Sequence, residues 1–312
     1  MKILIETPTW LGDAVMTTPA IENIMETYPH AKLIIFGSFV STKLFLKHPN
    51  VEKIIIDDSK KEGNRYINLY KLAKLVGSVK MAFSFRKNIT SKFFLFFVNT
   101  QKKYIYQRYT REEVHQVIRY NDFINKSLNI ESKANRLKIY IDGKKEKNAK
   151  LLLGLNPGAT YGSAKRWYPE EFAKVAIKLA SKYDIIIFGG PDETDIAQDI
   201  EEALKKANIS NFQNFAGKTS IEELVKNISK LNLFITNDSG PMHIAATFSV
   251  PTVSIFGPTR HIETHQWMNP QEMIIRRKMV CSPCMKRTCP LKHHECMKLI
   301  SAEDVLERLK NN

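Results

Sequence analysis

Long apolar runs are scarce in this chain of 312 residues. The longest strongly apolar stretch lies near residues 93–98, far short of the roughly 20 residues that a helix needs to span a bilayer. The first residues, MKILIETPTW, lack the long apolar region and the small-residue cleavage site of a secretory signal. We therefore expect a soluble, cytoplasmic protein, whose contact with a membrane would be peripheral.

Cysteine is also scarce, and all four cysteines fall in one window near the C-terminus. They are Cys281, Cys284, Cys289 and Cys296. Structural zinc sites usually show two close pairs separated by a longer loop, whereas this spacing, with His293 and His294 inside it, has one close pair only. Reduced thiols that pack a loop are the preferred interpretation for a cytosolic protein, and a zinc site is the alternative.

Acidic residues are outnumbered, with 47 Lys and Arg against 32 Asp and Glu and a net charge of +15. Residues 1–150 carry +13 of this excess and residues 151–312 carry +2. A positive field favours encounter with anionic partners, among them nucleic acid, acidic lipid head groups and phosphorylated glycans. A solvated basic surface without a partner would also explain the charge, so the charge alone leaves the partner open.

Short apolar runs alternate with segments of helical spacing along the whole chain. In the first half, strands are expected at residues 2–6, 32–36, 53–56 and 81–85, and helices at 14–28, 69–75 and 112–125. In the second half, strands are expected at 151–155, 184–188, 231–235 and 252–256, and helices at 169–181, 195–206, 221–228, 240–248 and 301–310. The polar, Lys-rich segment 142–150 reads as a linker. The pattern predicts an α/β fold of two doubly wound units, each with a parallel sheet.

In such folds a ligand lies outside the carboxyl ends of the strands, so the loops after the strands deserve inspection. The first is Thr7-Pro-Thr-Trp-Leu-Gly-Asp13. Asp13 stands where a helix N-cap belongs, stabilised by backbone amides and the positive end of the helix dipole. The same carboxylate is a candidate general base, and Gly12 allows a close approach of backbone or ligand.

The second loop runs from Asn156 to Trp167, after the first strand of the second half. Its candidate anion-binding groups are the amides of Gly158 and Gly162, the hydroxyls of Thr160 and Ser163, and the cations Lys165 and Arg166. The loop lacks the spacing of a Walker motif. A plain turn with exposed basic residues is the alternative interpretation.

Two further loops follow later strands. Glu193 ends Phe188-Gly-Gly-Pro-Asp-Glu193, where a carboxylate fits either a ribose contact or a helix cap. In Thr236-Asn-Asp-Ser-Gly-Pro-Met-His243, three polar or small residues stand at a helix start, which is a ready anion site. They are Asp238, Ser239 and Gly240. His243 falls in the first helical turn, where a structural histidine is the alternative, and Arg260 after the next strand is another candidate phosphate contact.

Together these residues resemble glycosyltransferase family 9, the lipopolysaccharide heptosyltransferases. The resemblance is carried by Trp10-Leu-Gly-Asp13 with Met16, Thr18 and Pro19, by Thr236 to Ala246, and by the cysteine-containing tail with Cys289-Pro290 and His294-Glu-Cys-Met297. Pro157-Gly-Ala and Ala164-Lys-Arg-Trp167 resemble the heptosyltransferase II branch of the family. Pro241 departs from the family pattern, in which an aliphatic residue is frequent, but Pro is tolerated in a first helical turn.

The resemblance implies a GT-B fold, in which two Rossmann-like domains face a central cleft. The expected domains are residues 1–148, which would bind the acceptor, and residues 149–312, which would bind the ADP-sugar. The last helix is free to pack back on the first domain. The middle of the first half, about residues 51–130, carries few family features, and acceptor differences are expected there.

The resemblance also implies an inverting transfer of L-glycero-D-manno-heptose from ADP-heptose to the first heptose of the lipopolysaccharide or lipooligosaccharide inner core of a Gram-negative bacterium. It makes Asp13 the catalytic base and Lys165 a ligand of the donor phosphates. The other residues of the donor site would be Thr160, Glu193 at the ribose, Asp238, Ser239, Gly240 and His243. Trp10 and Gly12 would face the acceptor.

Basic groups and amides can stabilise a leaving diphosphate, so no metal or other obligatory cofactor is expected. The expected partners are ADP-heptose, the lipid A–Kdo–heptose acceptor and the anionic inner-membrane surface. That surface would contact residues 92–97 and four neighbouring cations, Lys102, Lys103, Arg108 and Arg111, although phenylalanines at this spacing also suit a core.

Two alternatives remain open. A sister transferase would add another heptose or another sugar to the same core. A basic, non-catalytic nucleic-acid-binding protein would explain the charge but not the paired loops, and the chain lacks a recognisable nucleic-acid-binding motif.

Overall fold

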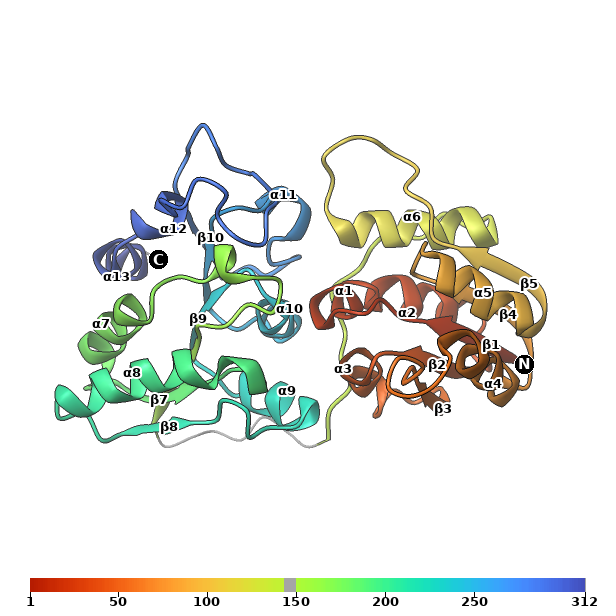
Figure 1. Ribbon diagram of the computed structural model, residues 1–312, viewed down its shortest axis with the longest axis horizontal. Coiled ribbons are helices and arrows are strands. Elements are labelled where there is room, and N and C mark those ends of the chain that lie inside the picture. The colour runs from red at the N-terminus through yellow and green to blue at the C-terminus, as the bar shows by residue number, and fades with distance from the viewer. Residues whose placement is uncertain (143–149, 312) are drawn as a thin grey trace. The chain divides into compact units, whose positions relative to one another are not determined.

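The structure is a computed structural model, and it describes residues 1–142 and 150–311. The chain divides after Asp142 into two compact units (Figure 1). The expected domain boundary between residues 148 and 149, and most of the expected linker, lie outside the described residues. No helix in the part that the structure describes is both long enough and apolar enough to cross a membrane.

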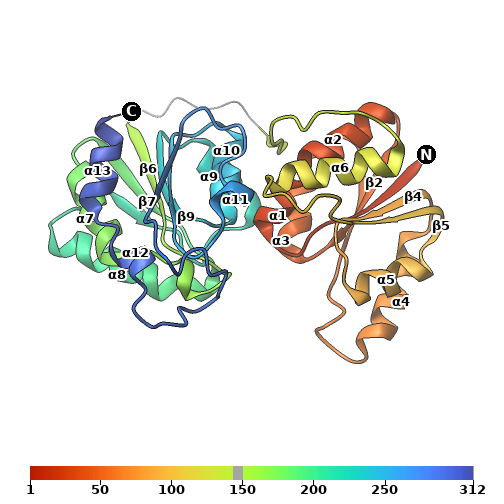
Figure 2. The same ribbon diagram turned by 90° about the horizontal axis from the view of Figure 1, so that it is seen from above.

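The first unit is built on a five-stranded parallel sheet in the order β3-β2-β1-β4-β5. Its strands are β1 (Lys2–Glu6), β2 (Lys32–Gly37), β3 (Val51–Ile56), β4 (Ser78–Ser84) and β5 (Asn99–Ile105). The inner strands are apolar at almost every position because helices cover both faces of a parallel sheet. Figure 2 shows α2 and α6 on one face and α4 and α5 on the other.

The helices of the first unit are α1 (Leu11–Met16), α2 (Thr18–Thr27), α3 (Phe39–Thr42), α4 (Arg65–Val76), α5 (Ile89–Phe97) and α6 (Gln116–Leu128), with a 3₁₀ turn η1 (Lys43–Phe45). The single helix expected over 14–28 is in fact α1 and α2, which meet at Thr17. Pro19 has no N–H to donate to the carbonyl of Val15, which instead accepts a 2.7 Å hydrogen bond from the Thr18 hydroxyl.

Three other departures have local causes. The helix expected from residue 112 begins only at Gln116, because the His115 side chain accepts the Val117 N–H and caps it there. Helix α5 and strand β5 were not expected at all. The run of four phenylalanines in α5 hides the helical period, and β5 is an edge strand with mostly exposed residues.

The second unit contains a six-stranded parallel sheet in the order β11-β10-β9-β6-β7-β8. Its strands are β6 (Leu151–Asn156), β7 (Tyr183–Ile187), β8 (Phe212–Asn214), β9 (Leu233–Asn237), β10 (Thr252–Phe256) and β11 (Glu272–Arg276). The expectation that 252–256 is the last strand was wrong, since β11 pairs in parallel with β10 beyond it. Both unexpected strands, β8 and β11, are short or half-exposed edges with weak apolar patterns.

Helices cover both faces of this sheet. They are α7 (Pro169–Leu179), α8 (Thr194–Lys206), α9 (Ile221–Ser229), α10 (Gly240–Thr247), α11 (His261–Thr264), α12 (Glu295–Lys298) and α13 (Ala302–Lys310), with 3₁₀ turns η2 (Ser163–Lys165) and η3 (Pro191–Glu193). In Figure 2, α7 and α13 lie on one side of the strands and α9 and α10 on the other. The terminal helix α13 packs against α7 and β11, both in the second unit.

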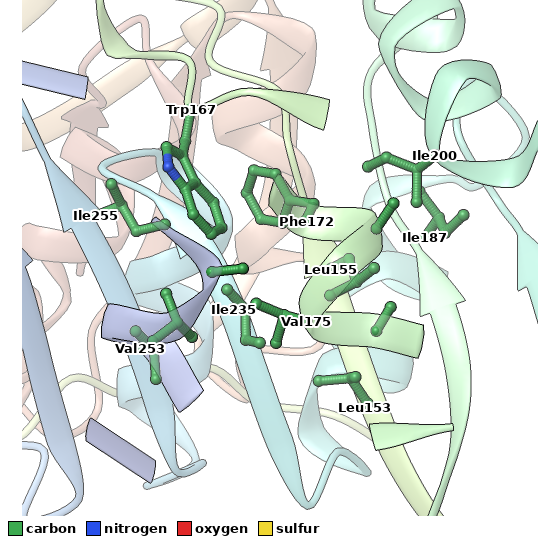
Figure 3. Close-up of a cluster of buried hydrophobic side chains, with 14 of the residues drawn as sticks. Leu153, Leu155, Trp167, Phe172, Val175, Ile187, Ile200, Ile235, Val253 and Ile255 are labelled. Atoms are coloured by element: carbon green, nitrogen blue, oxygen red, sulfur yellow. The ribbon is translucent and has the colours of Figure 1, made fainter. Parts of the chain in front are cut away.

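A buried cluster between the second sheet and α7, α8 and α13 anchors the loop that follows β6 (Figure 3). Trp167, at the end of that loop, is fully buried and meets the Phe172 ring edge-on at 4.8 Å. Its indole N–H donates to the Ile300 carbonyl at 2.8 Å. Fully burying a large apolar side chain stabilises a fold by roughly 1.5–3 kcal/mol, so Trp167 fixes the C-terminal end of the loop.

Each sheet reverses its strand order beside its first strand. β1 lies between β2 and β4, and β6 lies between β9 and β7. The connections on the two sides run over opposite faces of the sheet, which opens a crevice at the carboxyl ends of these strands. The loops after β1, β6 and β9 are therefore the places where each unit can hold a ligand.

Candidate functional site

Three of the expected site residues lie where the loop after β1 leads into α1. Trp10 is the N-cap of α1, with an extended backbone and a side chain that is 44% exposed. Asp13 stands in the first helical turn and is partly exposed, with Gly12 beside it. The expectation that Asp13 is itself the N-cap was wrong. A carboxylate in the first helical turn still interacts favourably with the positive end of the helix dipole.

The backbone before Trp10 is fixed by its neighbours. The Thr7 hydroxyl lies 2.9 Å from the Ser41 hydroxyl, and the Ser38 hydroxyl donates to the Thr9 carbonyl at 2.7 Å. The Arg86 Nε–H donates to the Thr7 carbonyl at 2.6 Å. These contacts come from the loops after β2 and β4, so the two strands that flank β1 hold the loop that carries Asp13.

A buried group of charges lies beneath this loop. Glu6, the last residue of β1, is 1% exposed and accepts a 2.7 Å hydrogen bond from the Ser91 hydroxyl. The Arg86 guanidinium lies 3.7 Å from the Glu6 carboxylate and 3.4 Å from that of Asp57. Burial raises the pKa of Glu6, and Arg86 opposes that rise. Sequence reasoning missed these residues, although a carboxylate that ends an otherwise apolar central strand is a signal.

Two tyrosines lie within the electrostatic reach of Asp13. Tyr106 and Tyr120 have ring centroids 5.2 Å apart, and Gln116 donates to the Tyr106 hydroxyl at 3.1 Å. Burial raises the pKa of both phenols, and the negative charge of Asp13 raises it further. Both phenols therefore stay protonated at physiological pH.

In the second unit, Lys165 and Asp238 form a buried ion pair. The Lys165 ammonium lies 2.6 Å from the Asp238 carboxylate, and the side chains are 13% and 4% exposed. The Thr259 hydroxyl donates to the same carboxylate oxygen at 2.6 Å. The three residues follow β6, β9 and β10, so the strand order brings Lys165 to two residues that lie more than seventy positions later in the sequence.

The loop after β9 leads directly into α10. Ser239 is the N-cap, α10 begins at Gly240, and Pro241 occupies the first turn as expected. His243 is buried, and one ring nitrogen, Nδ1, has no hydrogen-bond partner within the described residues. Burial lowers the pKa of His243 to about 4, with Asp238 opposing and Lys165 adding to the effect. The imidazole is therefore neutral at physiological pH.

The turn after β6 is tighter than the sequence suggested. Gly162 has a positive φ of 155°, and its N–H donates to the Ala159 carbonyl at 3.2 Å. The expectation that this N–H is free for an anion was therefore wrong. A Cβ on Gly162 would overlap the carbonyl oxygen of Arg287. Thr160 stands exposed on the same turn.

The Glu193 carboxylate packs against this turn. One of its oxygens accepts the Gly190 N–H at 2.8 Å, and the other lies 4.0 Å from the Arg166 guanidinium. The carboxylate also fills the space that a side chain on Gly158 would take. Glu193 therefore faces the loop after β6. Its bond to the Gly190 N–H is also a capping-box contact at the start of the 3₁₀ turn η3, which runs directly into α8, so both interpretations of this carboxylate stay open.

An asparagine that sequence reasoning missed ties the loops together. The Asn237 amide donates to the Pro157 carbonyl at 2.7 Å, and its oxygen accepts the Trp167 N–H at 3.0 Å. Asn237 thus clamps both ends of the turn that carries Lys165. A buried amide at the end of a strand, followed by a polar loop, is the signal that could have indicated it.

The cysteine-containing tail braces the same turn. All four cysteines are free, and they line a small pocket with His293 and His294. Burial raises the pKa of Cys296 to about 11, and the neighbouring thiols add to the rise. The His294 ring lies 2.9 Å from the Ala164 carbonyl and 3.1 Å from the Tyr168 hydroxyl. Among the described residues, no three His, Cys, Asp or Glu side chains are placed to hold a metal ion together.

Residues 78–295 match the model of glycosyltransferase family 9 (heptosyltransferase). This chain belongs to that family. It is 44% identical over 317 aligned positions to lipooligosaccharide heptosyltransferase 2 of Campylobacter jejuni serotype O:2, covering 100% of the chain and 98% of that protein. A Haemophilus influenzae lipooligosaccharide heptosyltransferase 2 is 29% identical, with 83% and 84% covered.

Solved structures show the same fold. Escherichia coli ADP-heptose lps heptosyltransferase II matches with a TM-score of 0.81 at 21% identity, covering 100% of this chain and 98% of that one. E. coli heptosyltransferase WaaC with ADP matches with a TM-score of 0.80 at 15% identity, covering 100% and 99%. The prediction of an α/β, GT-B fold is thus confirmed, as is the resemblance to family 9. The protein is a glycosyltransferase of the heptosyltransferase family, and the nucleic-acid-binding alternative finds no support.

Proposed function

We propose that this glycosyltransferase moves L-glycero-D-manno-heptose from ADP-heptose to the first heptose of a lipooligosaccharide or lipopolysaccharide inner core, with inversion at the anomeric carbon. The similarity to lipooligosaccharide heptosyltransferase 2 of C. jejuni, which spans the whole chain, supports this choice of substrates. The observation that carries the proposal is the Lys165–Asp238–Thr259 cluster at the carboxyl ends of β6, β9 and β10.

In this proposal the second domain, residues 149–312, binds the donor. The Lys165 ammonium and the amides at the start of α10, around Ser239 and Gly240, stabilise the diphosphate as it leaves. Asp238 and Thr259 hold Lys165 in place. These groups supply positive charge without a metal, so the proposed mechanism has no obligatory cofactor.

The remaining donor contacts follow from position and protonation. Glu193 faces the turn after β6, where a ribose hydroxyl can donate to it, and the Thr160 hydroxyl stands exposed on that turn. His243, neutral because of its low pKa of about 4, can hydrogen-bond a heptose hydroxyl without adding charge. In this proposal His243 orients the sugar and transfers no proton.

The first domain, residues 1–148, binds the acceptor in this proposal, with Trp10 and Gly12 beside it. The acceptor oxygen attacks the anomeric carbon on the face opposite ADP, and its proton passes to the Asp13 carboxylate. A bond forms between that oxygen and the anomeric carbon while the bond to the diphosphate oxygen breaks, and ADP leaves with its electron pair.

Lipid A anchors the acceptor in the membrane. In this proposal the enzyme therefore works at the cytoplasmic face of the inner membrane, as a peripheral protein.

Release of ADP from ADP-heptose, measured with a panel of truncated core acceptors, tests the proposal. Turnover is expected with Kdo₂–lipid A that carries one heptose, and not with the acceptor that lacks it. Turnover only on the heptose-free acceptor, or only on a longer core, would assign the chain to a sister transferase. Thermal stabilisation by ADP but not by oligonucleotides is expected in parallel.

A further inference from the structure

The outer surface of α4 and α5 is unusually apolar for a face that nothing covers in the described chain. Five residues on it are strongly exposed: Phe96 at 73%, Ile89 at 72%, Ile67 at 55%, Tyr66 at 44% and Tyr70 at 41%. Single exposed apolar residues are common on soluble proteins, but a contiguous group marks an interaction site. Figure 2 shows the two helices side by side on one face of the first sheet.

The aromatic rings on this face form one connected group. Tyr66 meets Phe93 at 4.9 Å, Phe93 meets Phe97 at 5.0 Å, and Phe97 meets both Tyr70 and Phe96 at 5.0 Å. The core side of the same helix is separate, because Phe94 and Leu95 are buried against the sheet. The expectation that the phenylalanines of residues 92–97 suit a core thus holds fully for Phe94 and in part for Phe93 and Phe97, which are half-buried and pack against the core cluster of the first unit, whereas Phe96 is exposed.

The segment of the chain that carries these rings is strongly basic. Between Glu62 and Glu112 the sequence contains eleven Lys and Arg residues and no Asp or Glu. Lys74 lies over the Tyr70 ring at 5.3 Å, and Lys103 of the edge strand β5 lies over the Phe96 ring at 5.9 Å. In the part of the chain that the structure describes, no ion pair joins Lys71, Lys74, Lys92 or Lys103 to a carboxylate.

We infer that this surface, the α4–α5 face, docks on the anionic head groups of a lipid bilayer. Aromatic side chains enter the head-group region, and the lysines around them meet lipid phosphates, as in interfacial helices. A second copy of the chain is disfavoured as the occupant, because two such faces would repel each other. The inference deepens the proposed function. It rests on that function only for the reason to dock, which is that the proposed acceptor is anchored in a membrane by its lipid.

Co-sedimentation with vesicles that contain no acceptor tests the docking directly. The intact protein is expected to bind vesicles of equal parts phosphatidylcholine and phosphatidylglycerol, and not phosphatidylcholine alone. Binding should weaken between about 0.1 M and 1 M salt, since the Debye length falls from about 10 Å to about 3 Å.

Two variants separate charge from apolar contact. Lys71→Gln/Lys74→Gln/Lys103→Gln should weaken binding about a hundredfold, at about fivefold for each lysine. Tyr70→Ser/Phe96→Ser should weaken it at least about tenfold through lost apolar burial. The matched control is Lys178→Gln/Lys206→Gln/Lys226→Gln, which removes three exposed lysines of the second unit and should leave binding unchanged.

Three results would overturn the inference. The control triple variant could weaken vesicle binding as much as the α4–α5 variants do, both α4–α5 variants could bind vesicles as well as the wild type, or the wild type could fail to bind anionic vesicles. A dimer in sedimentation velocity that both variants dissociate would also overturn it, because that result assigns the face to a second copy. Turnover on a deacylated, water-soluble acceptor should survive both variants, whereas turnover on acceptor embedded in vesicles should fall. A wild-type protein that binds vesicles but transfers heptose to neither acceptor would refute the proposed function and leave the docking surface standing.

Discussion

Replacing Lys165 with methionine should separate what the buried ion pair does for stability from what it does for catalysis. Methionine is unbranched and reaches as far as the Cε atom of lysine, and it removes the charge. The Asp238 carboxylate, 4% exposed, would then be buried without its cation. Breaking a buried pair in this way costs about 3–5 kcal/mol. Thr259 still donates to the carboxylate, so we expect the lower end, about 3 kcal/mol.

The double variant Lys165→Met/Asp238→Asn removes both charges together. Because no unpaired charge is left, stability should return to within about 1 kcal/mol of the wild type. Activity should not return, since the leaving diphosphate has lost its cation. Loss of one preorganised charge-stabilising group typically costs about 10²–10³ in kcat.

Urea denaturation of the wild type, both single variants and the double variant gives the coupling free energy of the pair. ADP release at saturating donor and acceptor gives kcat for the same four proteins. A double variant that regains kcat along with stability would show that Lys165 is purely structural. A single Lys165→Met variant with unchanged kcat would refute its role in stabilising the leaving group.

Three further changes probe other parts of the site. Asp13→Asn should lower kcat about 10²–10⁴-fold through loss of the general base while ADP affinity, measured by calorimetry, stays unchanged; a variant with full turnover would remove Asp13 from the mechanism. His243 has a folded pKa of about 4, below the unfolded value, so its contribution to stability is present above about pH 6.5 and is lost as the pH falls towards 4. The expected loss is about 3 kcal/mol, and His243→Gln should flatten that part of the pH profile of the unfolding free energy; an identical profile in the variant would contradict the assignment. Gly162→Ala should destabilise the second unit by more than about 1 kcal/mol because of its positive φ and the Arg287 carbonyl, with Gly190→Ala, at an ordinary φ, as the control; equal melting temperatures of the two variants would contradict this reasoning.

Most strands and helices, and their succession along the chain, were predictable from the sequence. The inner strands are apolar because both their faces are buried, and the helices between them are amphipathic. Strands β1 and β10 were expected with the bounds that the structure gives. The elements that were missed are edges, such as β8 and β11, where a strand is short or half-exposed and its pattern is diluted. Helix α5 was missed for the opposite reason, because its apolar residues lie on both its buried and its exposed side.

The sites divide in a similar way. Polar residues at strand ends were predictable, because parallel strands bring their carboxyl ends to one edge. The residues that these polar side chains contact were not predictable. Nothing local marks that Thr259 meets Asp238, that Asn237 clamps the turn after β6, or that Arg86 supports the loop after β1. Those contacts depend on strand order, which a single sequence does not specify.

Both sheets place a buried ion pair beside their central strand, and the two pairs differ in what they hold. In the second unit the cation is itself the group proposed to meet the substrate, and Asp238 keeps it aimed. In the first unit the Arg86 Nε–H donates to the Thr7 carbonyl, so the guanidinium holds the loop that carries Asp13. Buried pairs add little net stability compared with apolar residues of the same size. These ion pairs lie where each sheet reverses its strand order. Their presence there is therefore better explained by the position that each pair gives to a reacting group than by the stability of either sheet.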